Sequence, residues 1–93
     1  MSMGRVAIVY RLNPTTDESV EVDPEAIREM ALGLKSDEFD VQGAEVKPLA
    51  FGLKFVQVHV TMDDSEGLSD RFEEQLSTIT GVGEVEVVSL GLL

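Results

Sequence analysis

The sequence predicts an α+β fold with its elements in the order β-α-β-β-α-β. Three observations lead to this prediction. The 93-residue chain has room for one domain with a single two-layer core. Two segments repeat apolar residues at the spacing of a helix, each between two strand-like segments. Apolar and polar residues alternate as in strands in four segments, residues 5–12, 39–46, 53–62 and 84–90.

The first strand is expected to turn every second residue toward the core: Val6, Ile8, Tyr10 and Leu12. Asn13-Pro14 is expected to end it, and residues 15–21 to form an acidic loop. Asp23 then has the side chain of a helix N-cap, and Pro24 suits the first helical position. The helix carries one apolar stripe: Ile27, Met30, Ala31 and Leu34.

The second strand, residues 39–46, contains Gly43, which predicts a bulge or a bend, and Pro48 follows it. The third strand has the strongest pattern in the chain, with an apolar face of Val56, Val58, Val60 and Met62. A turn over residues 63–67 leads to a helix with Ser69 as its predicted N-cap. The apolar stripe of this helix is Leu68, Phe72, Leu76 and Ile79. Residues 81–83 then turn the chain into the fourth strand.

Two β-α-β units with right-handed crossovers form a four-stranded antiparallel sheet with both helices on one face. This is the ferredoxin-like two-layer sandwich, in which the sheet covers the apolar face of each helix. The opposite face of the sheet is then open, and it would present Phe55, Gln57, His59 and Thr61. The fold alone does not select a function.

Composition excludes several classes of function. The chain has no cysteine, which excludes disulfides, zinc ribbons, iron–sulfur clusters and thiol nucleophiles. It is strongly acidic, with 18 Asp and Glu against 7 Lys and Arg. The formal net charge of −11 repels phosphate backbones and anionic lipids, so we expect neither direct nucleic-acid binding nor membrane binding. The acidic residues either solvate the chain in high salt or steer it to a basic partner.

The apolar runs are too short to span a membrane, and the N-terminus does not have the pattern of a signal peptide. A small domain without cysteine is typical of the cytoplasm rather than of secretion. We therefore expect a cytoplasmic protein.

No pattern of residues predicts a catalytic site. His59 is the only histidine and lies in mid-strand, which favours a sheet-surface residue over a contact or pH-sensing role. Asp63, Asp64 and Glu66 form an acidic cluster that suits either a magnesium site or a solvated turn before a helix, and we favour the turn. The glycines of residues 81–83 suit a turn better than a phosphate-binding loop. We expect no catalytic residue, no metal and no cofactor.

Two activities known on this topology also fit poorly. Acylphosphatase chemistry needs an arginine in a phosphate-binding loop, and neither Arg5 nor Arg11 lies in one. RNA-recognition domains stack bases on paired aromatic residues amid basic charge, whereas Phe55 is alone among acidic residues.

Residues 48–54 (PLAFGLK) place an aromatic residue and a glycine in a turn between two strands. A helix–sheet core does not require Phe51, and Gly52 allows another backbone to approach closely. Two interpretations stay open at this point: Phe51 closes one end of the core while Gly52 adopts a positive φ, or Phe51 contacts a partner.

Residues 48–54 resemble the P-I-A-F-G-L-K stretch of the elongation factor 1-beta family, the guanine-nucleotide exchange factors of translation. The likeness is to the compact archaeal form, and it covers nearly the whole chain. The resemblance implies a ferredoxin-like exchange domain over residues 3–93, preceded by Met1-Ser2. Its other parts are residues 3–7 (MGRVA), 22–26 (VDPEA), 63–67 (DDSEG) and 81–87 (GVGEVEV).

The resemblance implies that the protein promotes exchange of GDP for GTP on elongation factor 1-alpha. Such a factor makes and breaks no bond, so no enzyme is expected. Phe51, Gly52 and Lys54 match the family's partner-binding loop, and Asp63 and Asp64 match an acidic pair after the third strand. The alternative is a ferredoxin-like regulatory or interaction module that binds a small molecule without exchange activity.

The sequence departs from the family pattern in two places. Eukaryotic relatives use a lysine near the C-terminus to disturb the magnesium site of the partner, but no cation follows Arg71 here. The resemblance therefore does not indicate which residue disturbs that site. The loop over residues 13–22 is also longer and more acidic than is usual in the family.

Overall fold

The structure, a computed structural model, describes residues 4–93. Met1–Met3 lie outside the described residues. They include Met3, the first residue of the predicted domain, and most of the N-terminal segment that lacks the pattern of a signal peptide. The elements are β1 (Arg5–Pro14), α1 (Pro24–Leu32), β2 (Asp40–Pro48), the short 3-10 turn η1 (Ala50–Gly52), β3 (Lys54–Asp63), α2 (Leu68–Ser77) and β4 (Val82–Leu92).

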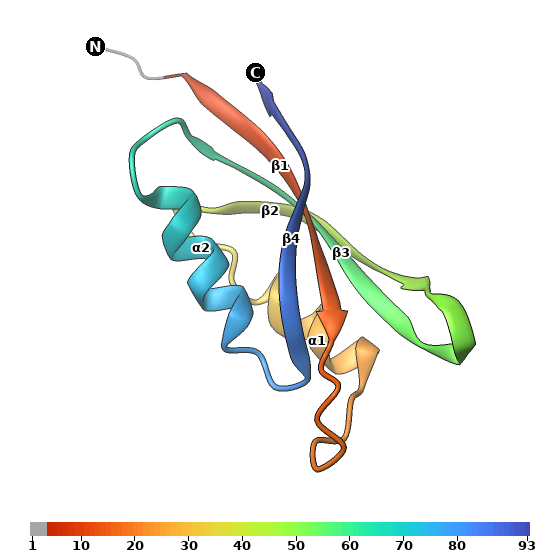
Figure 1. Cartoon of the computed structure of the whole chain (residues 1–93). Helices are drawn as coiled ribbons and strands as arrows, with labels where there is room; N and C mark the ends of the chain where they lie inside the picture. The colour runs from red at the N-terminus through yellow and green to blue at the C-terminus, as the bar shows by residue number, and fades with distance from the viewer. Residues whose placement is uncertain (1–3) are drawn as a thin grey trace.

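The strands form one sheet in the order β2-β3-β1-β4, and all neighbours are antiparallel. Figure 1 shows both helices on the same side of this sheet. The predicted ferredoxin-like sandwich is therefore confirmed. No helix within residues 4–93 is long and apolar enough to cross a membrane.

The core lies between the sheet and the two helices, and alternate strand residues fill it as the two-residue period predicts. In the two central strands Ile8 is opposite Val60 and Leu12 is opposite Val56, all of them buried. The ring of Phe72 from α2 packs between two others, 5.7 Å from that of Tyr10 and 4.9 Å from that of Phe39. The Tyr10 hydroxyl donates a hydrogen bond of 3.0 Å to the Glu73 carboxylate, which ties α2 to β1.

The start of α1 is confirmed. The Asp23 carboxylate accepts hydrogen bonds from the backbone N–H groups of Glu25 and Ala26, at 3.1 and 3.4 Å. The predicted stripe is only partly right, because α1 buries Ile27 and Ala31 but leaves Met30 59% exposed. Met30 instead lines a surface groove beside Ile79 and Thr80, the residues that follow α2.

The predicted N-cap of α2 is wrong. The helix begins at Leu68, and Gly67 occupies the cap position with a φ of 86° and no side-chain hydrogen bond. A left-handed glycine lets the chain enter the helix early, so Ser69 lies inside it. The rest of the stripe is as predicted, since Phe72 and Leu76 are buried and Ile79 packs on the core just beyond the helix.

The strand ends differ slightly from those predicted. Both Pro14 and Pro48 are the last residues of their strands, where a missing N–H removes no ladder bond that the sheet needs. The predicted bulge in β2 is confirmed, because the pairing with β3 shifts between Val41 and Gly43. Gly81 has the positive φ expected of a turn, at 96°, whereas Gly83 is already part of β4.

The last part of β4 is an exposed apolar strip at the edge of the sheet. Beyond Val85, which packs against the core, the helices no longer cover this strand, and Figure 1 shows its end extending past α2. The exposed apolar residues are Val87, Val88, Leu90, Leu92 and Leu93. Phe55, Gln57, His59 and Thr61 lie on the face without helices, as predicted, and they are half-buried there.

Candidate functional site

The segment 48–54 forms a tight turn that we call the β2–β3 hairpin. The Leu49 N–H donates to the Leu53 carbonyl at 2.7 Å, and the Leu53 N–H donates to the Ala50 carbonyl at 3.2 Å. Between them, Phe51 (φ 61°, ψ 33°) and Gly52 (φ 76°) are both left-handed. Positive φ at both central residues is typical of the tight turns that join antiparallel strands, because it matches the twist of the strands.

Phe51 is 99% exposed at the tip of this hairpin. The interpretation that it closes one end of the core is therefore wrong, because its ring touches almost nothing. A left-handed conformation costs a residue with a side chain about 1–2 kcal/mol. Since neither the ring nor the backbone of Phe51 stabilises the fold, this residue suits a contact outside the chain. Gly52 has the positive φ predicted for it.

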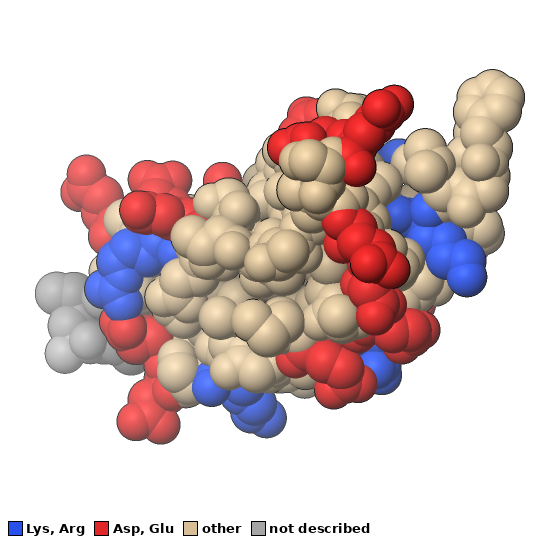
Figure 2. All heavy atoms as spheres, turned by 90° about the horizontal axis from the view of Figure 1, so that it is seen from below, with Lys and Arg blue, Asp and Glu red and all other residues tan. Residues whose placement is uncertain are grey.

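The hairpin is a projecting, acid-free part of an acidic molecule. Residues 46–62 contain no Asp or Glu, and Lys54 lies exposed at the foot of the turn. Figure 1 shows the hairpin extending beyond the helices, and in Figure 2 its tip bears no acidic side chain, in contrast to the red groups along the body. An acidic surface on a partner can therefore approach this end more easily than the rest of the chain.

Two clefts flank Leu53, which is itself 52% exposed at the foot of the hairpin. The β4-side cleft, of about 380 Å³, separates the hairpin from the end of β1 and the start of β4. The α1-side cleft, of about 290 Å³, lies between the hairpin and the start of α1. Pro14 and Thr15 form the wall opposite Leu53 in both clefts.

The wall formed by Pro14 and Thr15 is held in place by the turn before β4 and by the start of that strand. The Thr15 N–H donates to the Gly81 carbonyl at 2.8 Å. Gly83 packs so closely that a Cβ on it would lie 2.7 Å from the Cα of Thr15. Both clefts therefore exist before any partner binds.

Asp63 and Asp64 lie at the other end of β3 from the hairpin. Because β3 has ten residues, the two ends are about 30 Å apart. The Asp63 carboxylate forms an ion pair of 2.9 Å with Arg5, and the Asp64 N–H donates to the Gly4 carbonyl at 2.7 Å. The structure thus brings Phe51, Gly52 and Lys54 together and leaves the acidic pair apart. Within residues 4–93, no group of three or more His, Cys, Asp or Glu is placed to hold a metal ion.

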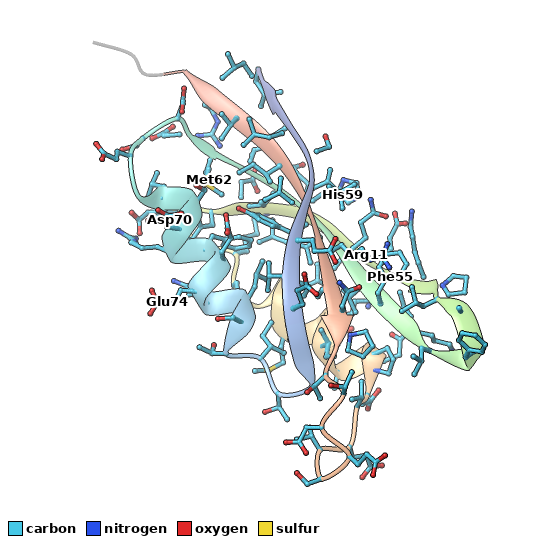
Figure 3. The ribbon with its side chains drawn as sticks, viewed as in Figure 1. Arg11, Phe55, His59, Met62, Asp70 and Glu74 are labelled. Carbon is cyan, nitrogen blue, oxygen red and sulfur yellow. The ribbon has the colours of Figure 1, made fainter. Side chains whose placement is uncertain are left out.

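The open face of the sheet carries a second ordered group of side chains. The Arg11 guanidinium lies over the Phe55 ring, 4.3 Å from its centroid. Arg11 also donates to Asn13 at 2.8 Å, and Asn13 donates to Glu86 at 2.6 Å. Figure 3 shows Arg11, Phe55 and His59 on the side of the sheet away from α2. His59 is a sheet-surface residue, as predicted, opposite Val9 and Gly43.

No local pattern in the sequence indicates the two clefts. Leu53 stands in the A-F-G-L-K run, so its position was visible, but its exposure was not. Thr15 and Glu84 come from segments far away in the chain, and only the sheet order places them beside the hairpin.

A ferredoxin-like sandwich with an almost fully exposed aromatic residue at the tip of a hairpin has the features of a protein-interaction domain. Residues 7–93 match the family model described as the EF-1 guanine nucleotide exchange domain. The chain belongs to this family.

Curated relatives named elongation factor 1-beta agree with this assignment. The protein of Archaeoglobus fulgidus is 32% identical over 91 residues, which cover 98% of this chain and 100% of that protein. The protein of Pyrobaculum calidifontis is 39% identical over 90% of this chain and 89% of its own length. The protein of Methanosphaerula palustris is 34% identical over 97% of this chain and 99% of its own length.

The function that the resemblance implied, guanine nucleotide exchange on a GTPase of translation elongation, is therefore confirmed. The alternative of a small-molecule module without exchange activity is not favoured. The similarity to archaeal proteins is likewise confirmed.

Proposed function

We propose that this protein binds elongation factor 1-alpha through the β2–β3 hairpin and accelerates the release of its GDP, so that GTP can bind. Residues 3–93 act as one exchange domain in the cytoplasm, where translation elongation takes place. The protein makes and breaks no covalent bond and is in this sense no enzyme.

The observation that carries this proposal is Phe51, 99% exposed on a turn whose backbone is already fixed. Burying a phenylalanine ring yields about 1.5–3 kcal/mol. A preformed hairpin loses little conformational freedom on binding, so most of this free energy appears as affinity. Aromatic anchors of this kind are common among the few residues that dominate the affinity of an interface.

Exchange then follows from reciprocal coupling of two binding equilibria. If this protein binds the nucleotide-free partner more tightly than the GDP-bound partner, GDP binds the complex more weakly by the same factor. A thousandfold loss of GDP affinity needs about 4 kcal/mol of such difference. Phe51 supplies apolar contact, Gly52 allows close approach, and the Lys54 ammonium can donate charge-assisted hydrogen bonds.

The acidic pair would contact a different region of the same partner, since it lies at the opposite end of β3. Arg5 already neutralises Asp63, whereas the side chain of Asp64 is exposed and forms no ion pair within residues 4–93. Asp64 is thus the member of the pair better placed to meet a cation.

The proposal is tested by the release of a fluorescent GDP analogue from the cognate elongation factor 1-alpha. Release should accelerate with increasing concentration of this protein and reach a plateau. The Phe51→Ala variant is the matched control, because it carries the same charges and should leave release close to the spontaneous rate. A spontaneous rate that the unmodified protein does not change, at the same salt concentration, would overturn the proposal.

A further inference from the structure

The two clefts beside Leu53 carry opposite charges. Glu84 is the one charged residue among those lining the β4-side cleft, and Lys54 is the one charged residue lining the α1-side cleft. Both side chains are exposed. The clefts are at the small end of the range for ligand pockets, roughly 300–1,000 Å³, which suits side chains better than a cofactor.

The side chains of Glu84 and Lys54 are unpaired within residues 4–93, whereas those of the neighbouring Glu86 and Lys47 each have a partner. Glu86, on the same face of β4, accepts a hydrogen bond of 2.6 Å from Asn13. Lys47, on β2, lies 3.8 Å from the Glu45 carboxylate. Within residues 4–93, neither Glu84 nor Lys54 forms an ion pair or a side-chain hydrogen bond. Each is therefore available to a charge supplied by a partner.

An apolar ridge lies between these two charges. Leu53 shares both clefts and is 52% exposed, although it is an aliphatic residue next to the sheet. Its backbone is fixed at both ends, by the hydrogen bonds with Leu49 and Ala50. The opposite wall is fixed by the contact of Thr15 with Gly83. A segment that entered the clefts would meet rigid surfaces and would pay little reorganisation free energy.

We propose that the contact with the GTPase is reciprocal: while Phe51 enters the partner, a segment of the partner crosses Leu53 and enters both clefts. That segment places an apolar side chain on Leu53, a Lys or Arg toward Glu84 and an Asp or Glu toward Lys54. This inference rests on the proposed function, and it gives the order of the charges along the partner segment. The order of its charges follows from the order in which the clefts flank Leu53.

The test measures the concentration of this protein that gives half-maximal acceleration of GDP release. Leu53→Ser removes the ridge, and Thr16→Trp adds bulk at the mouth of the β4-side cleft from an exposed position. Each should raise the half-maximal concentration about tenfold, equivalent to about 1.4 kcal/mol. Thermal melting of each variant shows whether it is folded, and Thr16→Trp changes no residue of the core.

Charge-reversal variants test the order of the charges along the partner segment. Glu84→Lys and Lys54→Glu should each raise the half-maximal concentration about three- to tenfold, the range expected when an exposed ion pair is replaced by repulsion. Glu74→Lys, on α2 and away from the hairpin, is the matched control for Glu84→Lys. Lys35→Glu is the control for Lys54→Glu, and thermal melting checks its fold because it also breaks the 3.4 Å ion pair of Lys35 with Asp40. Both controls alter the net charge equally and should change the concentration less than twofold.

The outcomes separate this inference from the proposed function. If Phe51→Ala abolishes acceleration but Leu53→Ser and Thr16→Trp leave it unchanged, the partner does not enter the clefts and the inference is wrong, while the proposed function stands. If the reversals at Glu84 and Lys54 raise the half-maximal concentration no more than their controls do, the assigned order of charges is wrong. If the unmodified protein fails to accelerate release, the proposed function fails first.

Discussion

Phe51 and Gly52 occupy consecutive left-handed backbone conformations, with φ of 61° and 76°, at the tip of the β2–β3 hairpin. Gly52 adopts this conformation without steric cost, but Phe51 does not. The same turn that strains Phe51 also holds its ring away from the core. Stability of the fold and presentation of the ring are therefore opposed at this position.

Replacement of Phe51 by Asn should separate stability from function. Asparagine tolerates the left-handed region better than phenylalanine, and the lost ring makes almost no contact in the free protein. We expect the free energy of unfolding to stay the same or to rise by up to about 1 kcal/mol, while acceleration of GDP release is lost. Urea denaturation measures the stability. A loss of more than 1 kcal/mol would show that the ring packs on the chain.

Gly83→Ala should destabilise the protein. The new Cβ would lie 2.7 Å from the Cα of Thr15, so the backbone of one strand must move. Overpacking of this kind costs about 1–3 kcal/mol. Gly91→Ala is the matched control, because it is on the same strand, has no positive φ and would meet nothing within 4 Å. Equal melting temperatures for the two variants would contradict the close contact between β1 and β4.

Tyr10 should keep its proton well into the alkaline range. Burial raises the pKa of the Tyr10 hydroxyl, and the Glu73 carboxylate raises it further by its charge and by the hydrogen bond. Tyr10 is the only tyrosine of the chain, so absorbance at 295 nm reports on it alone. In the native protein this absorbance should not rise at about pH 10, where an unfolded tyrosine ionises.

The raised pKa of Tyr10 also makes stability depend on pH. Below about pH 10 the hydroxyl is protonated in both states, so its contribution to stability is fully present. Above that pH only the unfolded state loses the proton, and stability falls by up to about 1.4 kcal/mol per pH unit. Tyr10→Phe should lack this part of the decline above about pH 10. Parallel curves for the two proteins would mean that Tyr10 ionises freely in the native state.

Added salt should raise the melting temperature. The net charge of −11 produces self-repulsion, which salt screens as the Debye length falls from about 10 Å at 0.1 M to about 3 Å at 1 M. Each kcal/mol of repulsion relieved should raise the melting temperature by about 4–8 °C. Thermal melts in KCl measure this response. A flat response would favour partner steering as the role of the acidic residues.

The sequence predicts those parts of the fold that local pattern controls. The alternation in residues 53–62 identified the buried face of β3, and Asp23-Pro24 identified the start of α1. The predictions are wrong at two positions where packing or geometry between elements determines the structure. Met30 follows the helical period but lines a surface groove, and Gly67 displaced Ser69 as the cap of α2.

The candidate site, too, can be predicted from the sequence only in part. The unusual Phe51-Gly52 pair was visible in the sequence, but the choice between core and surface required the exposed fraction of Phe51. The clefts depend on Thr15 and Glu84 meeting Leu53, which follows from the strand order and from the close packing of Gly83. No local pattern carries that information.

We propose that Phe51 is presented to the GTPase rather than to the interior of its own chain. Stopped-flow release of a fluorescent GDP analogue from elongation factor 1-alpha, with the Phe51→Ala and Met30→Ala variants compared at equal concentration, tests it most directly. Met30 is a suitable control because it is a second exposed apolar residue, 59% accessible on α1. Phe51→Ala is expected to lose most of the acceleration, while Met30→Ala retains it. Full acceleration by a folded Phe51→Ala variant would mean that Phe51 makes no contact on which exchange depends.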